Sequence, residues 1–246
     1  MHRLRFVLPS VIPRMSRDHN SAGVRRLTHL SHHLMSSTSR SEGVSTAPTN
    51  VTTKDVADMY IYDPEDPNDM YLPNEAWSKT SMELFNQLKR EAENSNGKWV
   101  KLKLKPRQGD TRLFTRGVTE HGKMFEYAIF VNKSEEKLHG VVQCGPYTEG
   151  PAGHVHGGAM ATLLDIGCGI LTNASGRRAV TANLSINYKV SLPLNSTVLL
   201  QSKIDHVVGR KVYSFAELKS ADGSILYATA TALFIEINKE AVQARK

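Results

Sequence analysis

The spacing of apolar residues in the first half of the chain predicts one helix followed by short strands. Between residues 75 and 93 apolar side chains recur at helical spacing with Lys and Glu between them, which is typical of an amphipathic helix. Asn74 stands before this segment as a candidate cap and Asn96-Gly97 follows it. We expect this helix to pack on the domain as an accessory element. Alternating patterns then predict hairpin strands at residues 112–120, 124–132 and 138–144.

The second half of the chain carries one wholly apolar segment and then four longer alternating ones. Residues 156–172 are apolar on every side, which predicts a helix that is buried all round. Strands are expected after it at residues 179–190, 196–208, 211–220 and 225–237. Short strands, a buried helix and four long antiparallel strands describe an α+β architecture in which a curved sheet wraps a central helix. This arrangement is the hotdog fold.

The composition of the N-terminal third predicts segments outside this domain. Residues 36–53 are rich in Ser, Thr, Gly and Pro, as flexible linkers are. The acidic stretch that follows contains prolines and predicts an extended arm on the surface. We therefore divide the chain into a targeting segment (1–40), a linker and extended arm (41–73), the hotdog domain with its accessory helix (74–240) and a tail (241–246).

The net charge of +7 is concentrated at the N-terminus. Residues 1–40 hold seven Arg, no Lys and one acid, whereas the remaining residues hold 24 Lys and Arg against 23 Asp and Glu. The basic balance therefore gives no reason to expect a nucleic-acid partner. An Arg- and Ser-rich, acid-poor segment that forms an amphipathic helix is typical of mitochondrial transit peptides. We expect a location in the mitochondrial matrix or intermembrane space, with a disordered basic tail and a cytoplasmic location as the alternative.

The two cysteines and the lengths of the apolar runs exclude other classes. Cys144 and Cys168 lack the spacing of metal ligands, so no metal is expected, and they fit a thiol-reducing compartment. Cys168 lies within the apolar helix and is interpreted as a buried structural thiol. No run reaches the ~18 apolar residues of a membrane span, which leaves peripheral membrane contact open.

The loop before the apolar helix carries the first candidate chemistry. It ends in His156-Gly157-Gly158, and glycines allow the backbone N–H groups at a helix start to approach a ligand. Such donors carry partial positive charge and stabilise negative charge that develops on a carbonyl oxygen. His156 would orient substrate or hydrogen-bond within the turn. The alternative is an ordinary glycine-rich entry loop.

Asp165 is the candidate partner of this turn because it is the only charged residue in the apolar helix. A buried carboxylate without a partner is costly, so Asp165 is either paired structurally or catalytic. The nine residues from His156 to Asp165 correspond to about 13.5 Å of helix rise and a rotation of about 180°. The two residues therefore do not meet within one chain. A two-fold dimer that places Asp165 of one protomer opposite the turn of the other solves this.

Several motifs resemble one family of enzymes. His156-Gly157-Gly158-Ala159, Asp165 and the strand 183–189 resemble hotdog acyl-CoA thioesterases. Residues 181–184, 186–189, 209–211 and 125–127 are similar to the mitochondrial thioesterase superfamily members four and five, and this likeness covers about residues 73–237.

The resemblance implies roles for particular residues. It implies that Asp165 is the catalytic acid/base and that His156 to Gly158 hold the thioester. It also implies coenzyme A contacts by Asn187 and by Arg210-Lys211, and Lys189 is a further candidate. Cationic side chains suit phosphates. From the residues alone, the favoured interpretation of these basic positions is turn residues on a solvated face.

Three functions follow as hypotheses. The first is hydrolysis of medium- to long-chain fatty acyl-CoA to free acid and CoA by a homodimer or tetramer, with Asp165 as general base or nucleophile and no cofactor. The second is an interaction protein that binds acyl-CoA or, as the resemblance to members four and five implies, regulates a protein kinase through its N-terminal arm. The third keeps the fold but makes the chain a hydratase or dehydratase.

Overall fold

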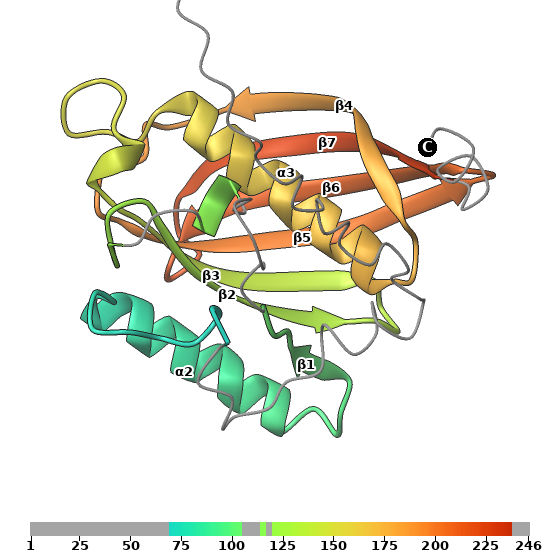
Figure 1. Ribbon diagram of the computed structural model, residues 1–246, viewed down its shortest axis with the longest axis horizontal. Helices are drawn as coiled ribbons and strands as arrows, with labels where there is room; N and C mark the ends of the chain where they lie inside the picture. The colour runs from blue at the N-terminus through green and yellow to red at the C-terminus, as the bar shows by residue number, and fades with distance from the viewer. Residues whose placement is uncertain (1–68, 105–113, 117–119, 238–246) are drawn as a thin grey trace, which may run out of the picture. The chain divides into compact units, whose positions relative to one another are not determined.

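The computed structural model describes residues 69–104, 114–116 and 120–237, which belong to the unit Thr49–Lys246 (Figure 1). The expected targeting segment and tail lie outside these residues. The helical elements are α2 (Lys79–Glu93), η1 (Phe114–Arg116), η2 (Pro146–Thr148) and α3 (Gly157–Ala174). The strands are β1 (Trp99–Lys101), β2 (Phe125–Asn132), β3 (Lys137–Cys144), β4 (Ala179–Tyr188), β5 (Thr197–Val208), β6 (Lys211–Ser220) and β7 (Leu226–Glu236).

The seven strands form one antiparallel sheet in the order β1-β2-β3-β5-β6-β7-β4. β5 pairs with β6 and β6 with β7, whereas β4 pairs only with β7 among the described strands and forms an edge of their sheet. The curved sheet wraps around α3, which contacts β3 to β7 (Figure 1). This is the predicted α+β hotdog fold.

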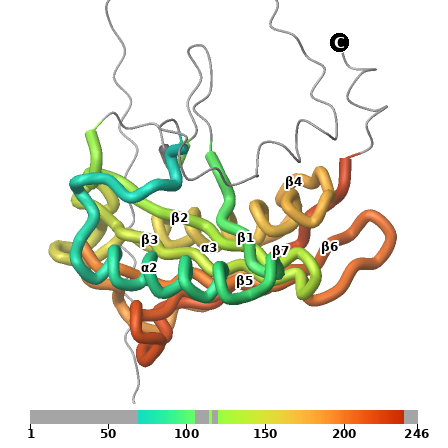
Figure 2. Tube along the Cα trace, turned by 90° about the horizontal axis from the view of Figure 1, so that it is seen from below, coloured from blue at the N-terminus to red at the C-terminus, as the bar shows by residue number. Residues whose placement is uncertain are grey.

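The two long helices lie on opposite faces of the sheet. On β5 the Ser202 hydroxyl donates to the Gly167 carbonyl of α3 (2.9 Å), whereas Thr197 bonds to Ser81 of α2 (2.7 Å). Because side chains alternate between the faces of a strand, these contacts put α3 on the inner face and α2 on the outer face (Figure 2). The accessory helix predicted for residues 75–93 is thus confirmed from Lys79 onward.

The start of α2 differs from the expectation. Ser78 is the N-cap, because its hydroxyl accepts from the Ser81 N–H. Asn74, the predicted cap, accepts instead from the Ala76 N–H and donates to Glu126 on β2. Asn74 therefore joins the chain before the helix to the sheet. A local sequence pattern does not distinguish these two uses of a capping side chain.

The end of the expected surface arm is described from residue 69, and there it is buried. The Lys101 ammonium donates to the Asp69 carboxylate at 2.6 Å, with both side chains enclosed. The other Asp69 oxygen accepts from the N–H groups of Tyr71 and Leu104. A buried ion pair persists where its remaining hydrogen bonds are satisfied, so this segment is joined to β1.

One local prediction fails, and one short strand was not predicted. A strand was expected at residues 112–120. The described residues in the middle of this range, Phe114–Arg116, form a 3-10 helix instead. Short β1 went unpredicted because three residues carry little periodic signal. It extends the sheet beyond β2.

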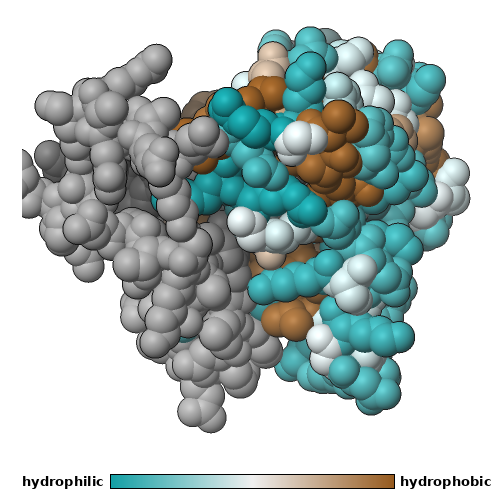
Figure 3. Space-filling model, turned by 90° about the vertical axis from the view of Figure 1, so that its right-hand side faces the viewer, coloured by the Kyte–Doolittle hydropathy of each residue, from teal (hydrophilic) through white to brown (hydrophobic). Residues whose placement is uncertain are grey.

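The central helix is apolar all round but is not buried all round. Met160, Leu164, Cys168 and Leu171 face the sheet and are buried, whereas Gly158 is exposed and Asp165 is half-buried. One stripe of α3 is therefore incompletely covered by its own chain. Exposed large hydrophobic residues also occur elsewhere, on β4 and near the β5–β6 turn, and hydrophobic patches interrupt the surface in Figure 3.

Candidate active site

The His156 turn forms the N-terminus of α3. His156 is the N-cap, and its Nδ1 accepts from the Gly158 N–H at 2.9 Å. Its own N–H donates to the Thr148 carbonyl at 2.7 Å, which joins the turn to the preceding loop. The sequence left open whether His156 orients substrate or bonds within the turn. The structure shows the bond within the turn.

The two glycine amides differ in their availability. The Gly158 N–H is already bonded to His156, whereas the Gly157 N–H makes no hydrogen bond to the described residues. The Gly157 N–H belongs to the peptide between His156 and Gly157. The carbonyl oxygen of that peptide accepts hydrogen bonds from the Ala159 and Met160 N–H groups. Hydrogen bonds at one end of a peptide strengthen the donor at the other. Gly157 therefore provides the available donor at the helix start.

Asp165 lies eight residues further along α3 and has a partner on β4. The Thr181 hydroxyl donates to Asp165 Oδ1 at 2.9 Å. The second carboxylate oxygen is available for a water molecule or substrate because no hydrogen bond to it occurs among the described residues. Sequence reasoning missed the Thr181 contact. Thr181 lies beside a register shift between Thr181 and Asn183 that no residue pattern indicated.

The two halves of the predicted site contact opposite ends of β4. Thr181 meets Asp165 near the start of the strand, whereas the Tyr188 hydroxyl donates to the Gly157 carbonyl at its end (2.9 Å). Thr181 and Tyr188 are seven positions apart, which corresponds to roughly 23 Å of strand. Asp165 and the His156 turn are therefore separate within one chain, as the helix geometry predicted.

The candidate coenzyme A residues also divide between two ends of the sheet. Asn187 and Lys189 are exposed where β4 ends beside Ala228, whereas Arg210 and Lys211 are exposed where β7 ends at Glu236. The intervening length of β7 is roughly 26 Å. Arg210 donates twice to the Glu236 carbonyl, at 3.0 and 2.8 Å. One chain does not bring these four residues together.

Other candidate chemistry is absent from the described residues. Burial raises the pKa of the Cys144 thiol to about 12, and burial with the nearby Asp165 charge does the same for Cys168. Both are free buried thiols, in agreement with the predicted structural role of Cys168. In the described ranges, no three His, Cys, Asp or Glu side chains gather as a metal site. No described helix has the length and apolar character to cross a membrane.

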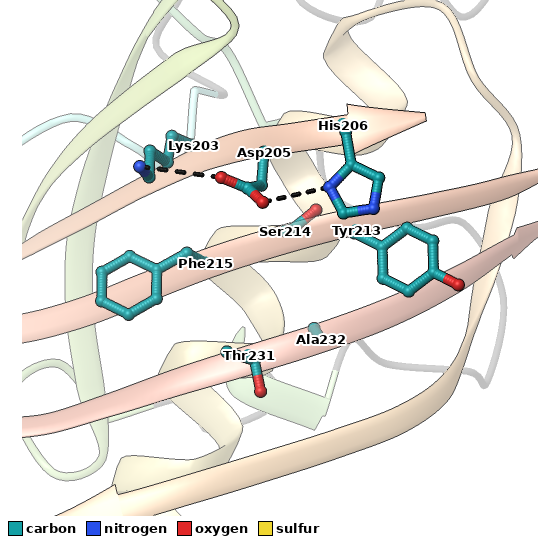
Figure 4. A pocket seen from close by; sticks show the side chains of 8 residues that line it. All are labelled: Lys203, Asp205, His206, Tyr213, Ser214, Phe215, Thr231 and Ala232. Atoms are coloured by element: carbon teal, nitrogen blue, oxygen red, sulfur yellow. Dashed lines mark hydrogen bonds and ion pairs between the residues drawn. The ribbon is translucent and has the colours of Figure 1, made fainter. Parts of the chain in front are cut away.

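A pocket of about 380 Å³ lies on the outer face of the sheet (Figure 4). Its lining includes Lys203, His206, Tyr213 and Phe215. The His206 and Tyr213 rings stack with centroids 4.3 Å apart, and Asp205 bonds to His206. The pocket contains none of the predicted site residues and faces away from α3.

The hotdog fold and the His156-Gly157-Gly158 turn at the start of α3 together indicate the class of protein. A model of the thioesterase superfamily matches residues 152–227, which include His156, both glycines, Asp165 and Thr181. A hypothetical thioesterase from Streptococcus pneumoniae, solved with coenzyme A, is 19% identical with a TM-score of 0.40 over 42% of this chain and 80% of that one.

Curated relatives narrow the class. The acyl-coenzyme A thioesterase THEM4 of Xenopus laevis is 37% identical over 189 residues, 72% of this chain and 84% of the relative. THEM4 of Bos taurus is 38% identical, covering 70% and 80%. THEM5 of Homo sapiens is 26% identical, covering 77% and 83%. The chain belongs to this THEM4 and THEM5 group of the thioesterase superfamily and is a thioester hydrolase, in agreement with the first hypothesis.

Proposed function

We propose that this protein hydrolyses medium- to long-chain fatty acyl-CoA to a fatty acid and CoA, with Asp165 and Gly157 as the reacting groups. The observation that carries this is the carboxylate of Asp165, half-buried on an apolar helix and held at one oxygen by Thr181. A carboxylate held in this way presents its other oxygen in a defined direction. The relatives named acyl-coenzyme A thioesterases support the substrate class.

The proposed reaction needs one base or nucleophile and one donor. Asp165 either removes a proton from water as the water attacks the thioester carbonyl or attacks that carbonyl itself. Negative charge develops on the carbonyl oxygen, where the Gly157 N–H stabilises it. The C–S bond then breaks, and the CoA sulfur leaves as a thiol by taking the proton that Asp165 removed from water, or a solvent proton in the route of direct attack. An anhydride formed by direct attack would be hydrolysed by water.

A two-fold dimer through β4 completes the proposed site. β4 is an edge strand, and most of its residues are exposed. If two β4 strands pair antiparallel, the Thr181 end of one lies beside the Tyr188 end of the other. Asp165 of one protomer then faces the Gly157 turn of its partner. The incompletely covered stripe of α3 supports the same arrangement.

The same pairing brings the proposed coenzyme A residues together. Asn187 and Lys189 of one protomer approach the end of the partner sheet where Arg210 and Lys211 lie. Three cations and an amide suit the phosphates and polar groups of coenzyme A. Tetramer formation from two dimers is a further stage that mass measurement of the purified protein tests.

Thiol release from myristoyl-CoA and palmitoyl-CoA by the full chain tests the activity. Asp165→Asn should lower turnover by at least about 100-fold, because one proton-transfer group contributes roughly that factor. Asp205→Asn is the matched control, since Asp205 is an exposed carboxylate on the outer face. A wild-type protein that binds acyl-CoA without hydrolysing it would reject the proposal and favour the binding or kinase-regulating role.

We also propose mitochondrial import through residues 1–40. Their seven Arg and single acid support it. Fusion of these residues to a fluorescent protein should give mitochondrial fluorescence, whereas a variant with the seven Arg replaced by Gln should stay in the cytoplasm. Diffuse fluorescence of the unaltered fusion would reject import.

A further inference from the structure

One peptide group at the start of α3 is hydrogen-bonded at both ends. The oxygen of the Gly157–Gly158 peptide accepts from the Tyr188 hydroxyl at 2.9 Å. Its N–H donates to His156 Nδ1, also at 2.9 Å. The first partner comes from β4 and the second from the turn itself. The peptide plane is therefore fixed by two elements that are distant in sequence.

This peptide needs such support because its residues are glycines. Glycine rotates about its backbone bonds at little energetic cost, and both Gly158 and His156 are exposed. Packing therefore contributes little to the orientation of the turn. The two peptides share the Gly157 α-carbon, so a displacement of the Gly157–Gly158 peptide would move the residue that carries the Gly157 N–H.

Tyr188 is placed to support the turn rather than to fill the core. It is 53% exposed on the edge strand β4 and so is not part of the core. A Cβ built at Gly157 would lie 3.5 Å from the Tyr188 Cζ and hydroxyl oxygen, in ordinary van der Waals contact. The ring therefore lies directly against the glycine whose N–H is available.

We propose that Tyr188 is a positioning residue that keeps the Gly157 N–H directed at the thioester carbonyl. The inference rests on the proposed function, in which that N–H stabilises the developing oxyanion. Tyr188 acts through the Gly157–Gly158 peptide and does not react. Because an oxyanion donor interacts more strongly with the transition state than with the substrate, its loss of alignment lowers kcat more than it raises KM.

The direct test removes only the hydroxyl. Tyr188→Phe in the full chain should lower kcat about 10-fold, less than the roughly 100-fold loss of an oxyanion donor itself, and change KM by less than about twofold. Tyr147→Phe is the matched control, because Tyr147 is exposed in the same loop region and its hydroxyl makes no hydrogen bond to the described residues. An unchanged kcat in a folded Tyr188→Phe protein overturns the proposal.

A spectroscopic measurement separates alignment from a merely structural effect. Asp165→Ala should bind acyl-CoA without turnover, so the stretching frequency of a 13C-labelled thioester carbonyl can be measured by difference infrared spectroscopy. Adding Tyr188→Phe should shift this frequency back toward its value in water, and adding Tyr147→Phe should not. An unaltered frequency with Tyr188→Phe overturns the proposal even if kcat falls.

Failure of the proposed function gives a different result. A wild-type protein without turnover on any acyl-CoA rejects the hydrolysis mechanism. The carbonyl frequency of the bound thioester still reports whether Tyr188 polarises it through the turn. The two proposals are therefore tested by separate readouts.

Discussion

The placement of the Asp165 carboxylate depends on two elements, α3 and β4. α3 supplies its position among apolar neighbours, and β4 supplies the Thr181 hydroxyl that donates to it. Hydrogen bonds to charged groups contribute about 1.5–3 kcal/mol. The Thr181 contact is therefore strong enough to select one orientation of the carboxylate.

Removal of the Thr181 hydroxyl tests that orientation. Thr181→Val keeps the shape of the side chain and should lower kcat about 10-fold or more, by the loss of a charge-assisted hydrogen bond. Thr181→Ser keeps the hydroxyl and should retain most of the activity. Steady-state kinetics with palmitoyl-CoA measure both. Equal activity of the Val and Ser variants would show that this bond does not position Asp165.

Two glycines of α3 should respond oppositely to alanine. A Cβ at Gly158 would lie 2.9 Å from His156 Nδ1, so His156 must move and its cap is lost, at a cost of about 1 kcal/mol. A Cβ at Gly169 meets only the Phe234 ring at 3.5 Å, and alanine favours the helix by roughly 0.5–1 kcal/mol. Thermal denaturation should give a lower Tm for Gly158→Ala and an unchanged or higher one for Gly169→Ala. The reverse order would contradict the capping role.

At the scale of elements, the outer layer of α2 and β1 depends on polar contacts as well as on apolar ones. His139 of β3 packs on the Trp99 ring of β1, with centroids 4.4 Å apart. Its Nε2 accepts a hydrogen bond from the Gln201 amide at 2.9 Å, which requires an unprotonated nitrogen. Burial lowers the pKa of His139 below its ordinary value of 6.5, with Glu91 opposing and Lys137 and Lys219 adding to the effect.

This shift makes stability sensitive to acid. Below pH 6.5 the unfolded chain takes up a proton on His139 that the folded chain resists, so the free energy of unfolding falls as the pH falls through that value. His139→Gln should reduce the drop in Tm between about pH 7.5 and 5.5. His206→Gln, at an exposed histidine, is the control. An equal drop in wild type and His139→Gln would contradict the assignment.

At the scale of the whole molecule, the edge strand β4 connects both halves of the proposed site. It bonds to Asp165 at one end and to the Gly157 turn at the other. In the proposed two-fold pairing of this strand, the two halves of each site come from different protomers. The proposal therefore makes the active site a property of the dimer.

Mixing two inactive variants tests this shared site. Asp165→Ala removes the proposed base, and His156→Ala removes the cap that holds the Gly157 turn, so each homodimer should have little turnover. After denaturation and joint refolding, half of the dimers contain one of each, and each of these holds one intact site. We expect about a quarter of wild-type turnover by statistical mixing. If each site lies within one chain, the mixture stays inactive.

The sequence by itself determined the elements with strong periodicity and the residues whose chemistry is unusual for their surroundings. The predicted strands at residues 124–132, 138–144 and 211–220 match β2, β3 and β6 within one residue. Asp165 was identifiable as a lone charge in an apolar helix, and His156-Gly157-Gly158 as a helix start. These signals are local, because helix period, capping chemistry and isolated charge are all read within a few turns of chain.

Only the tertiary structure decided which residues meet. It brought Thr181 to Asp165 and Tyr188 to Gly157, separations of 16 and 31 residues along the chain. It placed β4 at the sheet edge beside β7, although β5 follows it in sequence. It also distinguished the available Gly157 N–H from the engaged one of Gly158. Such pairings depend on strand order and register, which long-range packing selects and which single residues do not encode.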